Sequence, residues 1–313
     1  MNKIGLYLLL IGCISVSCNE NEIFEKEQYK TTLYLLSNSD QIYTEAYSLN
    51  NEESVKYLSI GCGGSNLNEE EVKIELELDT VLLKKYNKSN FDIDTASFAR
   101  LLPADRYKLD SMTATLPAHC RDSYVKVPIT VRAEGLSPDS TYFIPLAIKK
   151  VSEYEVNPEK FNVLYRVAIE NDYAEQLTTT YYQLKGSSLN EANGSTQIIS
   201  GTKPIQPLTR NKIRVFVGAA VLQTSVSKVP DFIKNAIVVQ VNQDSTLTIT
   251  PYGTIDVQQL PDSTLNVYQN NAKDDRRFLL YYRYRTLTTP ATATTPAVYS
   301  GWFTIKETLK RLE

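Results

Sequence analysis

The feature that most constrains the fold of this chain is a strict alternation of apolar and charged residues over positions 72–78. Successive side chains of a β-strand point to opposite faces, so the alternation predicts a strand with one face in a core and the other in solvent. The residues expected to face the core are Val72, Ile74, Leu76 and Leu78. Glu75 and Glu77 lie between them, and we expect them to be solubilising charges rather than catalytic acids.

Similar short segments recur along the chain, separated by turn-forming residues. Strands are expected over residues 31–36, 54–60, 72–78, 124–131, 141–151, 163–169, 178–184, 213–217, 236–242, 247–250, 278–284 and 299–305. The glycine-rich segment 61–64 should end the strand before it, Asp79 should cap a short helix over 81–86, and 306–312 should form a helical turn. The pattern predicts an all-β chain of two β-sandwich-like domains in tandem, the first immunoglobulin-like with one short helix.

The beginning of the chain has the features of a secretory signal. Lys3 is followed by an apolar run, residues 4–16, which is shorter than the roughly 20 residues that span a bilayer. Small residues directly precede Cys18, as in a bacterial lipobox, so Cys18 is the expected lipidation site. Cys13 also fits this motif, but it would shorten the apolar run and leave apolar residues just behind the anchor. The acidic residues after Cys18 resemble the surface-export signal of Bacteroidetes lipoproteins, which implies a lipid anchor in the outer membrane and exposure at the cell surface.

These features divide the chain into four parts. They are a signal peptide (1–17), a flexible tether (18–30), an N-terminal β-sandwich domain (31–172) and a C-terminal β-rich domain (175–313). The mature chain retains Cys62 and Cys120. The sequence leaves open whether these two form a disulfide or are two small buried residues.

No catalytic or cofactor motif is visible in the sequence. The one histidine, His119, rules out a cluster of histidine ligands, and the acidic runs at 69–71 and 274–275 lack the spacing of a calcium loop. The formal net charge is −3, and the basic residues are scattered rather than gathered in a stripe that would bind nucleic acid. We therefore expect no metal, no cofactor, no nucleic-acid partner and no enzymatic activity.

Several segments resemble a family of Bacteroidetes lipoproteins. One domain of this family is a domain of unknown function, whose pattern has a strand ending in glycines, a helix ending in Tyr-Asn, a Leu-Leu-Pro segment and a Tyr-x-(Ile/Leu)-Pro-Leu strand. This chain matches that pattern, in order and spacing, at residues 57–64, 82–87, 101–103 and 141–148. Residues 175–313 resemble the second β domain that often follows it, through segments 278–284 and 307–311.

This resemblance implies a role in glycan capture. The first domain also precedes family-18 endo-β-N-acetylglucosaminidase modules, and two-domain members are similar to accessory lipoproteins of glycan-uptake systems. The implied ligand is an oligosaccharide or polysaccharide, and the implied partners are surface glycoside hydrolases and an outer-membrane transporter. The family supplies no catalytic residue. The alternative is a structural or adhesive, fimbrial-like surface lipoprotein, which a strand leaving or entering the fold would indicate.

Six triplets consist of Asp, then Ser or Thr, then a residue with a small or aliphatic side chain or Thr, and they resemble the O-glycosylation sequon of exported Bacteroidetes proteins. The candidate hydroxyl groups belong to Thr80, Thr95, Ser111, Ser140, Ser245 and Ser263. Such triplets also start turns and helix caps, so both interpretations stay open.

The last hairpin supplies a candidate ligand site. If residues 278–285 pair with 299–305, alternation places Tyr281, Arg283 and Trp302 on one outer surface, away from the apolar set. Aromatic rings stack on sugars and planar polar groups orient them, so these three are the expected ligand-binding residues. The competing interpretation is that Trp302, the only tryptophan, is covered by a loop or another sheet.

Overall fold

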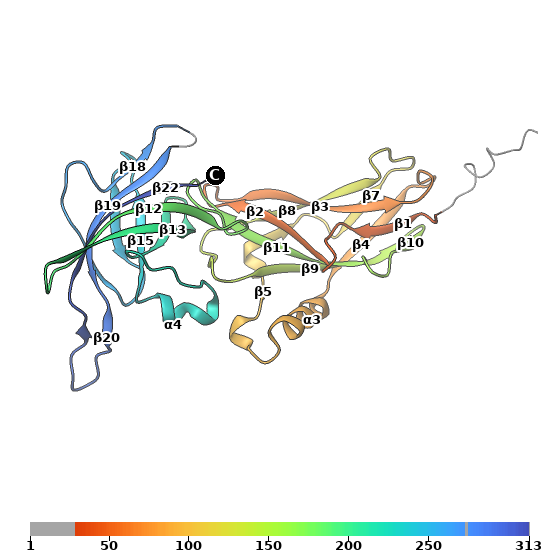
Figure 1. The fold of residues 1–313 in the computed structure, drawn as a ribbon. Coiled ribbons are helices and arrows are strands. Elements are labelled where there is room, and N and C mark those ends of the chain that lie inside the picture. Colours follow the sequence, from red (N-terminus) through yellow and green to blue (C-terminus); the bar gives the residue numbers. More distant parts are fainter. Residues whose placement is uncertain (1–28, 273–274, 313) are drawn as a thin grey trace, which may run out of the picture.

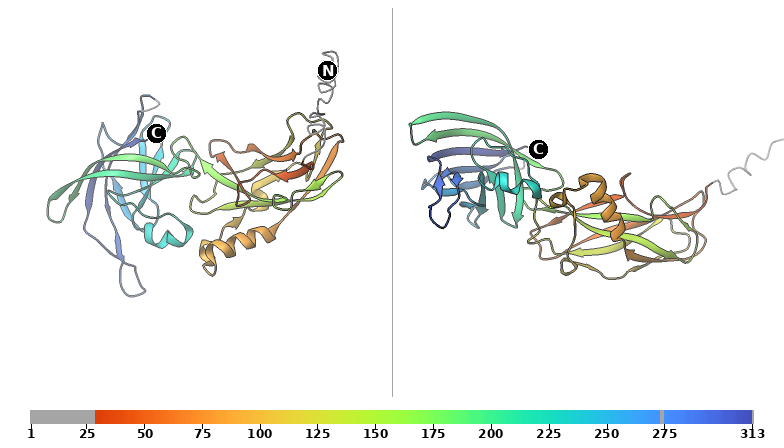
Figure 2. Two further views of the ribbon diagram at one scale, coloured as in Figure 1. Left: turned by 45° about the vertical axis from the view of Figure 1, so that its right-hand side comes forward. Right: turned by 90° about the horizontal axis from the view of Figure 1, so that it is seen from below.

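The computed structural model describes residues 29–272 and 275–312, which form two β-rich domains lying end to end (Figure 1). The predicted signal peptide, Cys18 and the tether up to residue 28 lie outside the described residues. The first described residues lie at the end of the first domain that is farthest from the second domain (Figures 1 and 2). The two buried cores divide between Ile169 and Ala174.

The first domain is a sandwich of two sheets. The five-stranded sheet has the order β10–β1–β3–β8–β6, and the six-stranded sheet has the order β2–β11–β9–β4–β7 with β5 paired to β9. The first contains β1 (Thr32–Leu35), β3 (Ser54–Gly63), β6 (Tyr107–Leu109), β8 (Tyr124–Val131) and β10 (Glu155–Val156). The second contains β2 (Ile42–Ser48), β4 (Val72–Leu78), β5 (Arg100–Leu101), β7 (Thr113–Leu116), β9 (Tyr142–Val151) and β11 (Asn162–Glu170). Two short 3-10 helices are η1 (Thr95–Ser97) and η2 (Ala104–Arg106).

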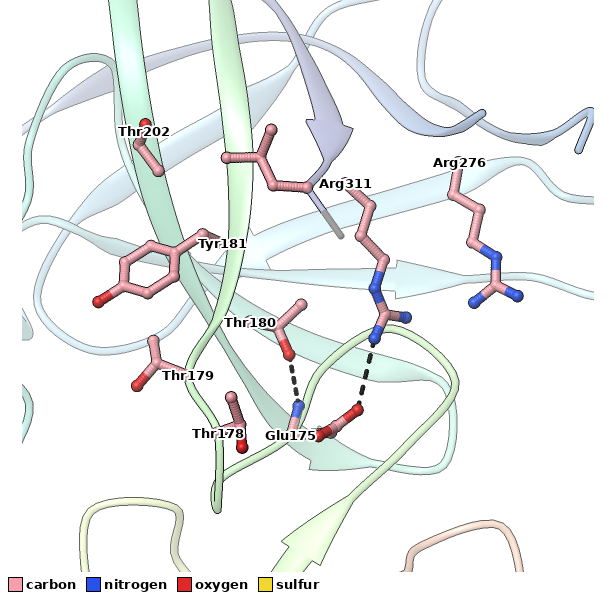
Figure 3. Close-up of a pocket in the computed structure, with 9 residues that line it drawn as sticks. Glu175, Thr178, Thr179, Thr180, Tyr181, Thr202, Arg276 and Arg311 are labelled. Atoms are coloured by element: carbon pink, nitrogen blue, oxygen red, sulfur yellow. Dashed lines mark hydrogen bonds and ion pairs between the residues drawn. The ribbon is translucent and has the colours of Figure 1, made fainter. Parts of the chain in front are cut away.

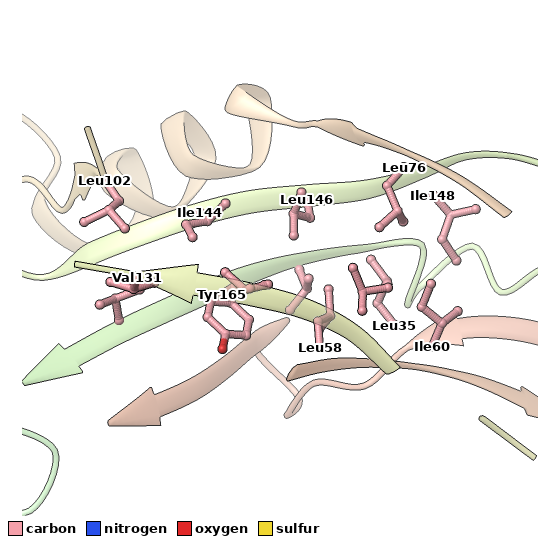
Figure 4. Close-up of a cluster of buried hydrophobic side chains, with 14 of the residues drawn as sticks. Leu35, Leu58, Ile60, Leu76, Leu102, Val131, Ile144, Leu146, Ile148 and Tyr165 are labelled. Atoms are coloured by element: carbon pink, nitrogen blue, oxygen red, sulfur yellow. The ribbon is translucent and has the colours of Figure 1, made fainter. Parts of the chain in front are cut away.

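The core of this domain lies between its two sheets, as Figure 4 shows. Val72 and Ile74 are fully buried and Leu76 is nearly so, and the glutamates between them are exposed, which confirms the alternation. The expectation for Leu78 was wrong, because this side chain is 48% exposed. Leu78 is the last residue of β4, where the chain leaves the sheet to begin a helix.

That helix, α3 (Thr80–Phe91), is longer than the sequence predicted. Its N-cap is Asp79, as expected, and the Asp79 carboxylate accepts hydrogen bonds from the backbone amides of Val81 and Leu82. Two leucines of the helix pack with Phe143 and Leu164 of the six-stranded sheet. The helix therefore covers the outer face of this sheet (Figure 2).

The expected break at residues 61–64 was wrong, because β3 continues to Gly63. The reason is visible at Gly61, where a Cβ atom would lie 2.4 Å from Cζ of the Tyr34 ring. The glycine provides room for that ring on the neighbouring strand and does not end the ladder.

The second domain is one nine-stranded sheet with the order β16–β15–β14–β13–β12–β22–β19–β17, and β18 pairs with β19. Its strands are β12 (Thr180–Asn190), β13 (Ser195–Thr209), β14 (Lys212–Phe216), β15 (Ala236–Val241), β16 (Leu247–Pro251), β17 (Asp256–Gln259), β18 (Val267–Asn270), β19 (Arg276–Arg285) and β22 (Phe303–Arg311). A separate hairpin joins β20 (Leu287–Thr289) to β21 (Val298–Tyr299), and η3 (Val226–Lys228) leads into α4 (Val229–Phe232).

This sheet curls until its two edges meet. The Gln259 side chain on β17 accepts a hydrogen bond from the Ile249 amide at 2.8 Å and donates one to the Leu247 carbonyl at 2.9 Å, both on β16. The fold class is confirmed as all-β with two domains in tandem, and the second domain is a curled, barrel-like sheet. The helical turn expected at 306–312 was wrong, because that segment belongs to the interior strand β22.

Candidate functional site

The junction between the domains contains a buried ion pair. Arg214 of β14 contacts Asp139 of the first domain through two nitrogen–oxygen pairs at 2.7 and 2.5 Å, and neither side chain is more than 3% exposed. The Arg214 guanidinium also lies 4.5 and 4.8 Å from the ring centroids of Phe232 and Tyr252. The Gln176 side-chain amide donates to two carbonyls of the Pro138 turn. The Gln176 contacts hold the linker between β11 and β12 against the first domain, and the Arg214–Asp139 pair joins the two domains directly.

An open cleft of about 810 Å³, which we call the junction cleft, lies beside this linker, at one end of the second domain (Figure 3). Its walls include Glu175, Tyr181, Arg276 and Arg311, together with several threonines. A second hollow of about 390 Å³ shares Glu175 and both arginines, so the two hollows adjoin one another. The Tyr181 ring is 48% exposed.

Strand register brings the two arginines together. Arg277 pairs with Lys310 across β19 and β22, which places Arg276 opposite Arg311 on the neighbouring positions. Arg311 forms an ion pair with Glu175 at 3.6 Å and donates a hydrogen bond to the Asp172 carbonyl at 3.0 Å. Figure 3 shows the Arg311 side chain directed toward Glu175.

Arg276 has a different environment. Within residues 29–272 and 275–312 no hydrogen bond or ion pair involves its side chain, and its Nε atom is buried without a partner. Burial raises the pKa of Tyr268, and the nearby positive charges of Arg276 and Arg311 act in the opposite direction. Like charges directly opposite on adjacent strands repel one another, and the carboxylates of Glu175 and Asp172, which also line the second hollow, offset part of this repulsion.

The hairpin predicted to contain the ligand site has the expected arrangement. Strands β19 and β22 are antiparallel, and the apolar residues Phe278, Leu280 and Tyr282 are fully buried. Tyr281 and Arg283 are half-buried on the opposite face.

Trp302, however, does not form an open platform. It is half-buried, and the guanidinium carbons of Arg283 and Arg285 lie 4.6 and 4.7 Å from its ring centroid. Arg283 is held by hydrogen bonds to Gln258, and Arg285 by an ion pair with Asp256 at 2.6 Å. The role of Tyr281, Arg283 and Trp302 in ligand binding stays a prediction, and the contacts around the indole are those of a packed cluster.

A tyrosine-rich face on the first domain was missed by the sequence reasoning. Tyr57 and Tyr124 are 45% and 41% exposed on β3 and β8, and the Lys126 ammonium lies 5.7 and 5.6 Å from their ring centroids. The alternation in segments 54–60 and 124–131 contained the signal, because it separates these residues from the buried set. The junction cleft gave no such signal, since its residues come from separate segments.

Cys62 and Cys120 are both free thiols in the structure, the first buried and the second half-buried. Burial raises the pKa of the Cys62 thiol, and the neighbouring Cys120 adds to this effect. His119 lies exposed in a turn with a left-handed φ of 53°.

The six candidate glycosylation hydroxyls differ in exposure. The five exposed ones belong to Thr80, Thr95, Ser111, Ser245 and Ser263. Ser140 is only 4% exposed beside the buried Asp139, so the folded domain has no room for a glycan there and this site was wrong. Turn and cap chemistry is present at Asp79, Asp244 and Asp262, whose carboxylates accept backbone hydrogen bonds. For the five exposed hydroxyls, glycosylation stays a prediction.

Residues 29–272 and 275–312 contain no group of three or more His, Cys, Asp or Glu side chains placed to hold a metal ion. In that same portion, no helix has the length and apolarity needed to cross a membrane.

Comparison with known protein families matches the chain to two domain models. A model for the N-terminal domain of a family matches residues 26–155, and a model for a C-terminal domain matches residues 161–310. A protein of unknown function from Bacteroides ovatus has a TM-score of 0.63 at 16% identity, over 89% of this chain and 93% of that chain. A multidomain protein including DUF1735 from the same organism has a TM-score of 0.61 at 16% identity, over 89% and 94%.

An auxiliary nutrient binding protein from Bacteroides thetaiotaomicron is also similar, with a TM-score of 0.55 at 13% identity, over 88% of this chain and 93% of that chain. At these identities the likeness concerns the fold. No match to a curated protein sequence was found.

Proposed function

We propose that this protein is a lipid-anchored accessory protein that binds glycans at the cell surface without cleaving them. The chain belongs to the two-domain family whose N-terminal model matches residues 26–155 and whose C-terminal model matches residues 161–310. Its proposed partners are glycoside hydrolases and an outer-membrane transporter of the same surface. The fold that this chain shares with the auxiliary nutrient binding protein supports an accessory role for this chain.

The junction cleft is the observation that carries this proposal. It is large enough for several sugar units, and it combines an exposed tyrosine ring with guanidinium, carboxylate and hydroxyl groups. A pyranose has an apolar face that stacks on a ring such as Tyr181, and the polar groups orient its hydroxyls. We prefer this cleft to the Trp302 cluster, whose indole already contacts two ion-paired or hydrogen-bonded arginines.

The shape of the molecule supports the lipid anchor. The described chain begins at the end of the first domain that is opposite the second domain, so an anchor at Cys18 would hold the cleft away from the membrane (Figure 1). Two or more acyl chains give stable attachment, because each buried methylene contributes about 0.8 kcal/mol. Replacing Cys18 with Ala should release the protein from the membrane fraction. Acyl chains found on Cys13 by mass spectrometry would contradict the assignment.

A non-catalytic role fits the carboxylates of the cleft. Glycoside hydrolysis uses two carboxyl groups flanking the scissile bond, one of them free to act as an acid. Glu175 is instead engaged by Arg311, and its backbone amide donates to the Thr180 hydroxyl. The fimbrial alternative needs a strand available for another subunit. The last strand, β22, lies inside the sheet between β12 and β19, which argues against donation of this strand.

Affinity gels containing different polysaccharides test the function. The mature chain should be retarded by at least one glycan, and Tyr181→Ala should abolish the retardation. The matched control is Tyr57→Ala, which removes a tyrosine of similar exposure from the first domain. Retardation lost in the Tyr57 variant but kept in the Tyr181 variant would move the site to the tyrosine-rich face. A mature chain that no glycan retards would overturn the function.

A further inference from the structure

We propose that the junction cleft selects glycans that carry an oxyanion, the carboxylate of a uronic acid or a sulfate ester, and that Arg276 binds this group. The inference rests on the glycan-binding function proposed above and names the class of sugar.

The first observation is that the Arg276 side chain has no partner among residues 29–272 and 275–312. Arg311 has Glu175 and the Asp172 carbonyl as partners, whereas no described residue pairs with the Arg276 guanidinium. Removing a polar group from water costs free energy unless a partner replaces the water. The Nε atom is buried and out of reach of solvent, so the donors that a ligand can meet are the terminal nitrogens of this half-buried side chain, which lines both hollows.

The second observation is the position of this donor. Arg276 and Arg311 line both hollows, so an oxyanion at Arg276 would belong to a ligand that occupies the larger cleft. The charges of both arginines also reach the same buried phenols, because each opposes the burial that raises the pKa of Tyr182 and Tyr268. A bound anion at Arg276 would supply the counter-charge that Glu175 supplies to Arg311.

The chemistry of the side chain indicates the kind of anion. A guanidinium group presents its donors in a planar fork that matches a carboxylate or a sulfate with two parallel hydrogen bonds. A neutral sugar offers only hydroxyls, which do not match the charge. The cleft should therefore distinguish an acidic glycan from its neutral ester.

The test compares acidic and neutral glycans on the mature chain. The probes are polygalacturonate, its methyl ester and a sulfated carrageenan, in affinity gels and by calorimetry. We expect binding to an acidic probe, no comparable binding to the methyl ester, and weaker binding at high salt. The carboxylate and the sulfate arms identify which oxyanion is preferred.

Variants locate the contact. Arg276→Gln should weaken acidic binding by about tenfold or more, since a hydrogen bond to a charged group is worth at least that factor. Arg276→Lys should retain part of the binding, because it keeps the charge and loses the fork. The matched control is Arg277→Gln, because Arg277 points to the opposite face and pairs with Asp275.

Equal binding of the acidic and ester probes, or acidic binding that survives Arg276→Gln, would overturn the inference and leave the glycan-binding function standing. Binding only to neutral polysaccharides would do the same. Absence of binding to every glycan would overturn the function as well. The comparison of acid and ester on the native chain holds even where a variant fails to fold.

Discussion

Lys203 and Glu307 form an ion pair inside the barrel-like second domain, where both side chains are fully buried. Their nitrogen and oxygen atoms lie 2.6 Å apart, and Lys203 also donates to the Phe216 carbonyl at 2.8 Å. The Tyr282 hydroxyl donates to the other Glu307 oxygen at 2.9 Å. Gly186, opposite Glu307, provides space, since a Cβ atom there would lie 2.3 Å from the neighbouring Lys306 carbonyl oxygen. Burial lowers the pKa of Lys203, and the charge of Glu307 opposes this effect.

Glu307→Gln should destabilise the second domain by about 3–5 kcal/mol, because it leaves the Lys203 ammonium buried without a counter-charge. Denaturant unfolding measures the loss. The control is Glu53→Gln, which breaks an exposed ion pair with Arg132 and should leave stability nearly unchanged, because solvent screens that pair. Replacing Lys203 with Met in the Glu307→Gln background should restore stability. A Glu307→Gln protein as stable as the native one would show that the pair is not charged.

Trp302→Ala should act on stability rather than on ligand binding. The substitution removes the ring against which Arg283 and Arg285 pack, and the expected cost is about 1–3 kcal/mol. Chemical denaturation and glycan affinity gels on the same variant separate the two effects. Lost glycan retention at unchanged stability would restore Trp302 as a ligand platform.

At the scale of elements, β3 and β1 show how a glycine determines packing across a sheet. Gly61 pairs with Tyr34, whose ring occupies the space of the missing side chain. A strand that carried a side chain here would force the ring off the sheet.

Gly61→Ala should therefore destabilise the first domain by about 1–3 kcal/mol, the usual cost of overpacking. The same substitution in a Tyr34→Ala background should cost less, because the clashing ring is gone, and a double-mutant cycle measures the difference. Gly301→Ala is the control, since its Cβ would meet its nearest side-chain neighbour, the Ala192 Cβ, at an ordinary 3.6 Å. Equal costs in both backgrounds would show that Tyr34 is not the cause.

At the scale of the whole molecule, the Asp139–Arg214 pair links the two domains. Asp139→Asn leaves the buried Arg214 without its counter-charge, so we expect a loss of about 3–5 kcal/mol. Scanning calorimetry should also show two unfolding transitions that lie farther apart than in the native chain. Glu155→Gln, which breaks an exposed pair with Lys30, should change neither feature. A single unshifted transition for Asp139→Asn would mean that this pair does not couple the domains.

The half-buried Tyr43 makes the protein sensitive to alkali. Burial and a hydrogen bond to Glu45 raise the pKa of Tyr43 from its ordinary value of 10.0 to about 12. Between these values the unfolded chain loses the phenol proton before the folded chain does, so the contribution of Tyr43 to stability is fully present below about pH 10 and is lost as the pH rises toward 12.

Unfolding midpoints measured at pH values about one unit apart, from about pH 9 to about pH 12, should show this decline. Tyr43→Phe should flatten it, and Tyr29→Phe, at a residue that is 75% exposed, should not. A decline that is identical in the Tyr43→Phe variant would assign the alkaline sensitivity to other groups.

The sequence by itself determined the all-β class, the tandem arrangement, the cap at Asp79 and most core-facing strand residues. These features are local, because alternation and capping depend on neighbours in the chain. It did not reveal β13, because the first part of that strand is polar and largely exposed, nor the exposure of Leu78 at the end of β4.

Only the tertiary structure decided which charges meet. Arg276, Arg311 and Glu175 come together through strand register and the path of the linker, and Asp139 reaches Arg214 across a domain junction. Register and curl depend on contacts between residues far apart in the sequence, for which alternation along one strand holds no information. Trp302 is a further example. The strand pattern placed its side chain on an outer face, but only the tertiary structure shows that the arginines of the neighbouring strand cover the indole.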